Sequence, residues 1–135
     1  MAHAGQEIEG YGGFRLRLVT TGAETDGQLL EMEAAYGEGS MLPPEHLHPS
    51  QDEHFEVLEG AVLTVIAGEE HRYATGETFD VPAKTPHQMT GDGPARVRWQ
   101  VRPALRTAEF FERLYSGAGE DLREEFSAEI QFTAT

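Results

Sequence analysis

Residues 39–60 read GSMLPPEHLHPSQDEHFEVLEG, and this stretch decides how the rest of the chain is interpreted. It contains two histidines one residue apart, His46 and His48, followed by Glu53 at the start of an apolar run. On an extended strand the two rings project to the same face, with their backbones roughly 6 to 7 Å apart. Glu53 can approach them from a neighbouring strand. Two imidazoles and a carboxylate suit a divalent transition metal, although an isolated HxH in a proline-rich loop is more often simply exposed.

A second stretch, residues 76–91, reads GETFDVPAKTPHQMTG and leads from a glycine through a proline loop to His87. Together the two stretches resemble the two conserved motifs of the cupin superfamily, with the resemblance strongest over residues 36–91. It implies an all-β fold, a double-stranded β-helix or jelly-roll-like barrel, with one metal inside one mouth. By the same resemblance the metal ligands are His46, His48, Glu53 and His87, and the assembly is a homodimer.

The sequence departs from the cupin motifs at three places. Six residues rather than the usual five separate Gly39 from His46, Lys84 replaces a common loop glycine, and Gly91 replaces a frequent asparagine. None of these changes removes a proposed ligand. We expect Lys84 to be a solvated surface residue rather than a catalytic one.

The pattern of short apolar runs between Gly and Pro predicts many strands. Apolar and charged residues alternate over 14–18, 30–34 and 96–102, which is the period of a half-buried strand, and Pro103 ends the last run. Residues 55–58 and 61–66 flank Glu59-Gly60 and predict a β-hairpin. Residues 71–73 can return as a further strand, and 78–81 form another short apolar run.

The period changes to three or four residues from Thr107, a candidate N-cap, and the apolar positions then predict an amphipathic helix that stops at Gly117 and Gly119. These positions are Ala108, Phe111, Leu114 and Tyr115. A weaker helical pattern follows from Glu120 and Asp121 through Leu122, Phe126 and Ile130. We expect both helices to cover the outside of the barrel or a partner subunit, rather than to form a lid. The domain boundaries are then a flexible start at 1–10, a barrel at 11–103 and a C-terminal helical segment at 104–135.

The amino-acid composition restricts the possible ligands, partners and location of the protein. The 135 residues, 39% of them hydrophobic, suffice for one domain, and the absence of cysteine restricts a metal site to nitrogen and oxygen ligands. A formal charge of −14 argues against binding nucleic acid or an anionic membrane surface. The sequence has no run of about 18 apolar residues, and Met1 to Gly10 do not read as a secretory signal, so we expect a cytoplasmic location.

Three imidazoles and one carboxylate leave one or two open positions on a six-coordinate ion. This suits Fe, Mn, Ni, Co or Cu, with Zn possible at a lower coordination number. Alternation along the strands places Phe55 and Met89 on the faces of the ligands as candidate pocket walls, with Trp99 as a third. His54 should face the opposite side of its strand, and we expect His3 and His71 to be exposed.

Three classes of function fit such a site, all with a small organic metabolite as ligand. The one we prefer narrowly is an oxygen-dependent enzyme of the dioxygenase type. The second is a non-redox isomerase, lyase or cyclase in which the metal acts as a Lewis acid and an unligated Glu53 serves as the base. The third is a binding module or sensor that catalyses nothing.

Overall fold

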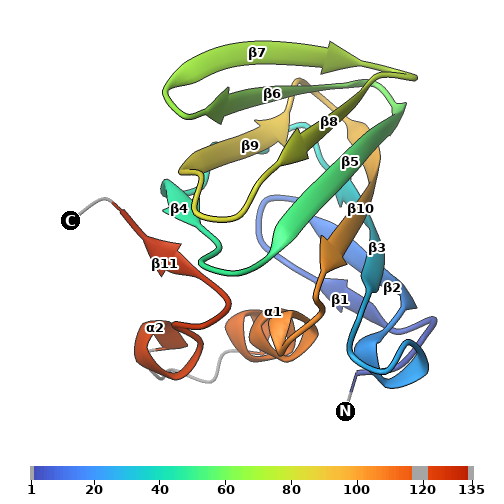
Figure 1. Cartoon of the computed structure of the whole chain (residues 1–135). Helices are drawn as coiled ribbons and strands as arrows, with labels where there is room; N and C mark the ends of the chain where they lie inside the picture. The colour runs from blue at the N-terminus through green and yellow to red at the C-terminus, as the bar shows by residue number, and fades with distance from the viewer. Residues whose placement is uncertain (1, 117–121, 134–135) are drawn as a thin grey trace.

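Two antiparallel sheets enclose the core of the protein in a computed structural model that describes residues 2–116 and 122–133 (Figure 1). The six-stranded sheet has the order β1 (Glu7–Glu9), β2 (Arg15–Thr20), β3 (Leu30–Tyr36), β10 (Ala95–Arg102), β5 (Asp52–Glu59) and β8 (Thr78–Val81). The five-stranded sheet has the order β11 (Gln131–Phe132), β4 (His46–Leu47), β9 (His87–Gly91), β6 (Ala61–Ile66) and β7 (Glu69–Ala74). The predicted all-β architecture with a C-terminal helix is confirmed.

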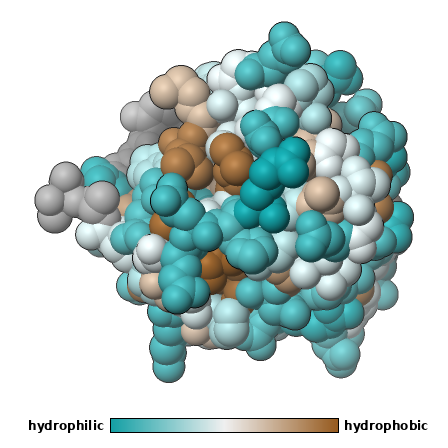
Figure 2. Space-filling model, turned by 90° about the horizontal axis from the view of Figure 1, so that it is seen from above, coloured by the Kyte–Doolittle hydropathy of each residue, from teal (hydrophilic) through white to brown (hydrophobic). Residues whose placement is uncertain are grey.

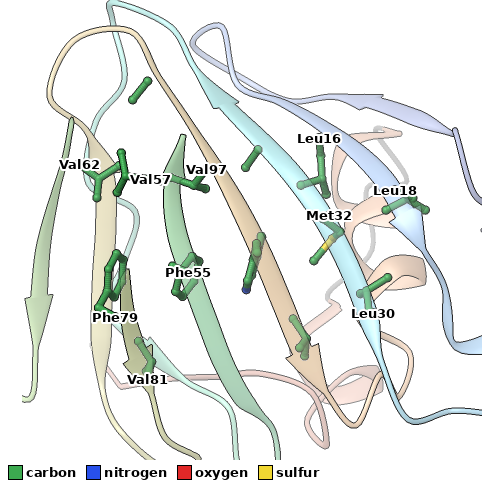
Figure 3. Close-up of a cluster of buried hydrophobic side chains, with 14 of the residues drawn as sticks. Leu16, Leu18, Leu30, Met32, Phe55, Val57, Val62, Phe79, Val81 and Val97 are labelled. Atoms are coloured by element: carbon green, nitrogen blue, oxygen red, sulfur yellow. The ribbon is translucent and has the colours of Figure 1, made fainter. Parts of the chain in front are cut away.

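Alternating burial along the long strands builds the core. In β10, Val97, Trp99 and Val101 are buried, whereas Arg98 and Arg102 on the other face are exposed. Apolar side chains from the six-stranded sheet and from β6 meet in one cluster (Figure 3). The face seen in Figure 2 is mostly hydrophilic, with hydrophobic residues visible in small patches. The predicted strands at 14–18, 30–34 and 96–102 are confirmed as β2, β3 and β10.

The predicted hairpin around Glu59-Gly60 is wrong, although both of its strands exist. Strand β5 pairs with β10 and β8, whereas β6 pairs with β7 and β9, so the chain crosses from one sheet to the other at Gly60. Gly60 has a φ of 72°, and a Cβ there would lie 2.4 Å from the carbonyl oxygen of Pro94. A glycine between two apolar runs marks a sharp change of direction, but it does not say whether the next strand returns beside the first.

The C-terminal region differs from the prediction in three details. Helix α1 (Thr107–Tyr115) is present, but Arg106 rather than Thr107 occupies the N-cap position. Helix α2 (Leu122–Glu125) is short, and the chain then extends into β11 instead of continuing as a helix to Ile130. The spacing of Leu122, Phe126 and Ile130 reflects one further turn, in which the Ile130 N–H donates to the Phe126 carbonyl. The predicted signals at Gly117, Gly119, Glu120 and Asp121 lie outside the described residues.

The predicted flexible start over residues 1–10 does not hold for Glu7–Glu9, which form β1 and pair with β2. The reason is Ile8, which is buried against the core between two exposed glutamates. Among the described residues, no helix has the length and apolar character needed to cross a bilayer.

Candidate metal centre

The three histidines of the two motifs converge between neighbouring strands of the five-stranded sheet. His46 begins β4, His48 follows that strand directly, and His87 begins β9, where it is the register partner of His46. One ring nitrogen from each histidine lies within 4.8 Å of the others. The structure therefore brings together all three imidazoles that the sequence singled out.

The main chain fixes the orientation and tautomer of each ring. Every Nδ1 contacts a backbone carbonyl oxygen, which can only accept a hydrogen bond, so each Nδ1 must carry the proton. The contacts are His46 with Pro44 (3.1 Å), His48 with Glu129 (2.8 Å) and His87 with Thr85 (2.9 Å). In the neutral rings Nε2 is then left with a free lone pair, as metal ligation requires.

Glu53 approaches the imidazoles from β5 in the other sheet, and its side chain is almost completely buried. Its Oε1 lies 3.2 Å from Nε2 of His48 and 3.0 Å from Nε2 of His87. Neither Oε1 of Glu53 nor Nε2 of His48 has a hydrogen-bond partner, although both atoms are buried. With the ring proton on Nδ1, the two atoms face each other as acceptors. Leaving such an atom unpaired costs about 1–3 kcal/mol, and a cation shared between the two atoms would remove that cost. The donor set thus fits a divalent transition metal.

The other carboxylate oxygen of Glu53 is occupied. Trp99 on the adjacent strand β10 donates its indole N–H to Oε2 over 2.8 Å. This bond holds the carboxylate so that Oε1 is the oxygen directed at the histidines.

The charges in the centre also suit metal binding. Burial alone would raise the pKa of Glu53, but the neighbouring His48 and His87 outweigh burial and lower it, so the carboxylate is ionised. Burial, helped by His87, lowers the pKa of His46 to about 4, which keeps that ring neutral at pH 7. Burial also acts to lower the pKa of His48, but the Glu53 carboxylate raises it overall, so a proton competes with a metal there.

A cavity of about 600 Å³ opens from these residues into the space between the sheets. The three predicted wall residues, Phe55, Met89 and Trp99, all line it. Sequence reasoning missed the contribution of the C-terminal region, which supplies Phe110, Phe111, Leu114, Tyr115, Ile130 and Phe132. The apolar stripe on α1 was the available signal, but a stripe of this kind does not tell a barrel surface from a pocket wall.

The remaining polar candidates lie away from the centre. His54 faces outward as predicted and pairs with Asp80 over 2.7 Å, while His3 and His71 are exposed. The Lys84 side chain is exposed, and its backbone has a φ of 68°. Its N–H donates to the carbonyl of His48 over 2.8 Å, so Lys84 acts through its main chain at the position where the related motif has glycine.

Comparison with known proteins gives consistent matches. The sequence model of a family described as a cupin domain matches residues 32–101. The tetracenomycin polyketide synthase protein TcmJ of Streptomyces glaucescens is 35% identical over 81 residues, which cover 58% of this chain. The match spans about half of that protein, 52% of its length.

Two solved structures share the fold at low sequence identity. KdgF from Halomonas sp. is 20% identical, with a TM-score of 0.64 over 73% of this chain and 86% of that one. An RmlC-like cupin from Shewanella frigidimarina is 14% identical, with a TM-score of 0.64 over 76% of this chain and 87% of that one. At these identities the likeness supports the fold alone.

Proposed function

We propose that this chain, which belongs to the cupin domain family, is an enzyme that binds one divalent transition metal and acts on a small apolar metabolite. The metal ligands would be His46, His48, His87 and Glu53. The observation that carries the proposal is the set of ring nitrogens within 4.8 Å of one another beside a buried, unpartnered carboxylate oxygen. Such a group of buried acceptors is costly without a cation at its centre.

The walls of the cavity favour a substrate with fused or conjugated rings. Apolar and aromatic side chains dominate them, and among the described lining residues Glu53 is the one carboxylate and there is no lysine or arginine. The volume of about 600 Å³ falls in the usual range for small-molecule sites. The related protein from Streptomyces is named for a polyketide synthase, and polyketides are carbonyl-rich chains that close into such rings.

The reaction class that we favour is a non-redox step on a carbonyl compound, such as ring closure or isomerisation. When bound, the metal supplies a Lewis acid that polarises a carbonyl oxygen. The histidines hold the metal in place, and Trp99 keeps Oε1 of Glu53 directed toward it. The walls from β5, β10 and α1 exclude water and orient the apolar body of the substrate. If Glu53 is not a ligand, its buried carboxylate is the group placed to accept a proton.

An oxygen-dependent reaction is the second candidate. One observation favours it: apart from the proposed ligands and three tyrosines, the described cavity wall offers no acid or base. Oxygen chemistry at a redox metal needs no separate acid or base. The two candidates differ in their requirements, because the Lewis-acid reaction proceeds anaerobically and tolerates Zn, whereas the oxygen-dependent reaction needs dioxygen and a redox-active ion.

The metal content of the natively purified protein, measured by mass spectrometry, is the first test. We expect about one transition metal per chain, lost in His48→Ala and kept in His54→Ala, which alters an outward-facing histidine of the same region. Glu53→Gln separates the two roles of the carboxylate. If Glu53 is a metal ligand, the variant retains less metal, whereas if Glu53 is a base, the variant keeps its metal and loses turnover. A folded wild-type protein that takes up no metal contradicts the proposal.

The substrate class is tested by titrating a dihydroxyanthraquinone, a stable tricyclic hydroxyketone, into the metal-loaded protein. Trp99 is the single tryptophan of the chain and lines the cavity, so its fluorescence reports occupancy directly. We expect saturable quenching, and a sugar phosphate of similar size should give none. Quenching by the phosphate alone would contradict an apolar substrate.

A further inference from the structure

Residues 122–133, here called the C-terminal clasp, lie against the strand that begins at His46 and leads directly into His48. Strand β11 of the clasp pairs with β4, with Phe132 opposite His46 and Gln131 opposite Leu47 (Figure 1). The N–H of Thr133 also donates to the carbonyl of Glu45. Ile130 and Phe132 form part of the cavity wall. The clasp is therefore in contact with both the proposed ligands and the substrate cavity.

His48 differs from the other two histidines in what orients it. The Nδ1 atoms of His46 and His87 donate to carbonyls two residues earlier in their own loops. His48 donates instead to the carbonyl of Glu129 in the clasp, 81 residues away in sequence, in a buried contact of 2.8 Å. The correct tautomer of this one ring thus depends on where the clasp lies.

Besides its pairing with β4, the clasp has an apolar anchor that packs on helix α1 and not in the main core. Phe126 is completely buried in a small cluster of its own, separate from the main core. The members of this cluster are Phe110, Leu122, Phe126 and Ile130. The buried Glu129 carboxylate accepts a hydrogen bond from the backbone N–H of Arg106 over 3.1 Å. Losing these contacts would loosen the clasp, including β11 at the edge of the five-stranded sheet, while the other strands of the two sheets keep their own packing.

We propose that the C-terminal clasp is a positioning element of the metal centre, which holds His48 in its ligating tautomer through the main-chain carbonyl of Glu129. The inference rests on the proposed function, since it assigns the clasp a role toward the metal. Groups that orient a ligating histidine typically change metal affinity 10- to 100-fold when they are lost. The clasp lies outside residues 32–101, which match the cupin domain, so this support is not supplied by the matched part of the chain.

The test compares Phe126→Ala, which removes the buried anchor of the clasp, with Leu18→Ala, an equally buried truncation on β2. Leu18 belongs to the main core and does not line the cavity. Zn²⁺ affinity is measured on the full chain by competition with a chromogenic chelator. We expect affinity to fall about 10- to 100-fold in Phe126→Ala and to change less than about twofold in Leu18→Ala.

A second readout reports on the ring itself. In the metal-free protein at alkaline pH, nitrogen NMR of the histidine side chains should show His48 protonated at Nδ1 in the wild type and in Leu18→Ala. In Phe126→Ala we expect a mixture of tautomers, a change that general destabilisation does not produce. Glu129→Ala is a milder release of the clasp, and it replaces Phe126→Ala if that variant does not fold.

The outcomes separate the two proposals. Wild-type affinity together with an unchanged His48 tautomer in the clasp variants would overturn the inference and leave the metal function intact. Equal losses of affinity in Phe126→Ala and Leu18→Ala would also overturn it, because the effect would then be loss of stability. A wild-type chain that binds no Zn²⁺ and no other transition metal would overturn the proposed function, and the role of the clasp with it.

Discussion

At the scale of single residues, the contact between Trp99 and Glu53 connects the core to the candidate site. Trp99 lies opposite Phe55 in the register of β10 and β5, and Glu53 lies two residues before Phe55 on β5. This diagonal position lets the indole N–H reach Oε2. Alternation along the sequence predicted the face of Glu53 and named Trp99 as a wall residue. The hydrogen bond itself could not be predicted from the sequence, because it depends on strand register and on two side-chain rotamers.

Trp99→Phe keeps an aromatic ring in the wall but removes the indole N–H that donates to Oε2 of Glu53. We expect the free energy of unfolding of the metal-free protein to fall by about 1–3 kcal/mol, because a buried carboxylate oxygen loses its partner. We also expect metal affinity to fall about tenfold or more, because Glu53 is no longer held in place. Urea denaturation followed by circular dichroism and a chelator competition measure the two effects. Unchanged values in both would mean that the bond has no role.

Lys84 holds a left-handed backbone conformation, with a φ of 68°, that costs a residue with a Cβ about 1–2 kcal/mol. Glycine adopts it freely but loses more entropy on folding, so we expect Lys84→Gly to stabilise the protein by about 0.5–1 kcal/mol. Lys84→Ala is the matched control, since it removes the charge and keeps the Cβ, and it should leave stability nearly unchanged. Equal effects of the two substitutions in urea denaturation would show that the side chain, and not the backbone, matters.

At the scale of elements, the strands were predictable but their partners were not. One-sided burial leaves an alternating pattern in β2, β3 and β10, so the sequence alone locates them. Pairing depends on contacts between distant residues, which is why the expected β5–β6 hairpin proved to be a crossing between sheets. Strands β4 and β11 have two residues each, too few for any period, although β4 carries a ligand.

The crossing at Gly60 gives a test of its own. A Cβ at Gly60 would meet the Pro94 carbonyl oxygen at 2.4 Å, whereas at Gly68, which also has a positive φ, a Cβ would meet nothing within 4 Å. Gly68→Ala should therefore cost about 1 kcal/mol, for the backbone conformation alone. Gly60→Ala should cost about 1–3 kcal/mol more, because backbone atoms must also shift. The midpoints of urea denaturation compare them, and equal losses would rule out the steric contribution.

At the scale of the whole molecule, the sequence predicted one metal-binding barrel but not the closure of its cavity. The resemblance of two local motifs to those of cupins pointed to the four candidate ligands, because the residues of each motif are close in sequence. The cavity wall formed by α1 and the clasp was missed, because the docking of one element on another is not encoded in a local pattern. The homodimer stays a prediction.

Metal binding should stabilise the folded chain as a whole, because the unfolded chain has no preformed site. At a free metal concentration about 100-fold above the dissociation constant, the expected gain is about 2.7 kcal/mol. Thermal unfolding with Zn²⁺ and with a chelator measures this gain as a rise of several degrees in Tm. His48→Ala should show no rise, and His54→Ala should show the full one. A wild-type Tm that does not respond to any transition metal would contradict the site.

The single register pair between β4 and β9, His46 with His87, has a consequence for how the folded chain is held together. The chain has no cysteine, so no covalent cross-link joins its distant parts. A metal bound by these two histidines would tie together residues about 40 positions apart in the folded chain, and it would be released on unfolding because the unfolded chain has no preformed site. In that sense the ion would serve this protein as a reversible counterpart of a disulfide, made and broken by metal supply and not by redox state.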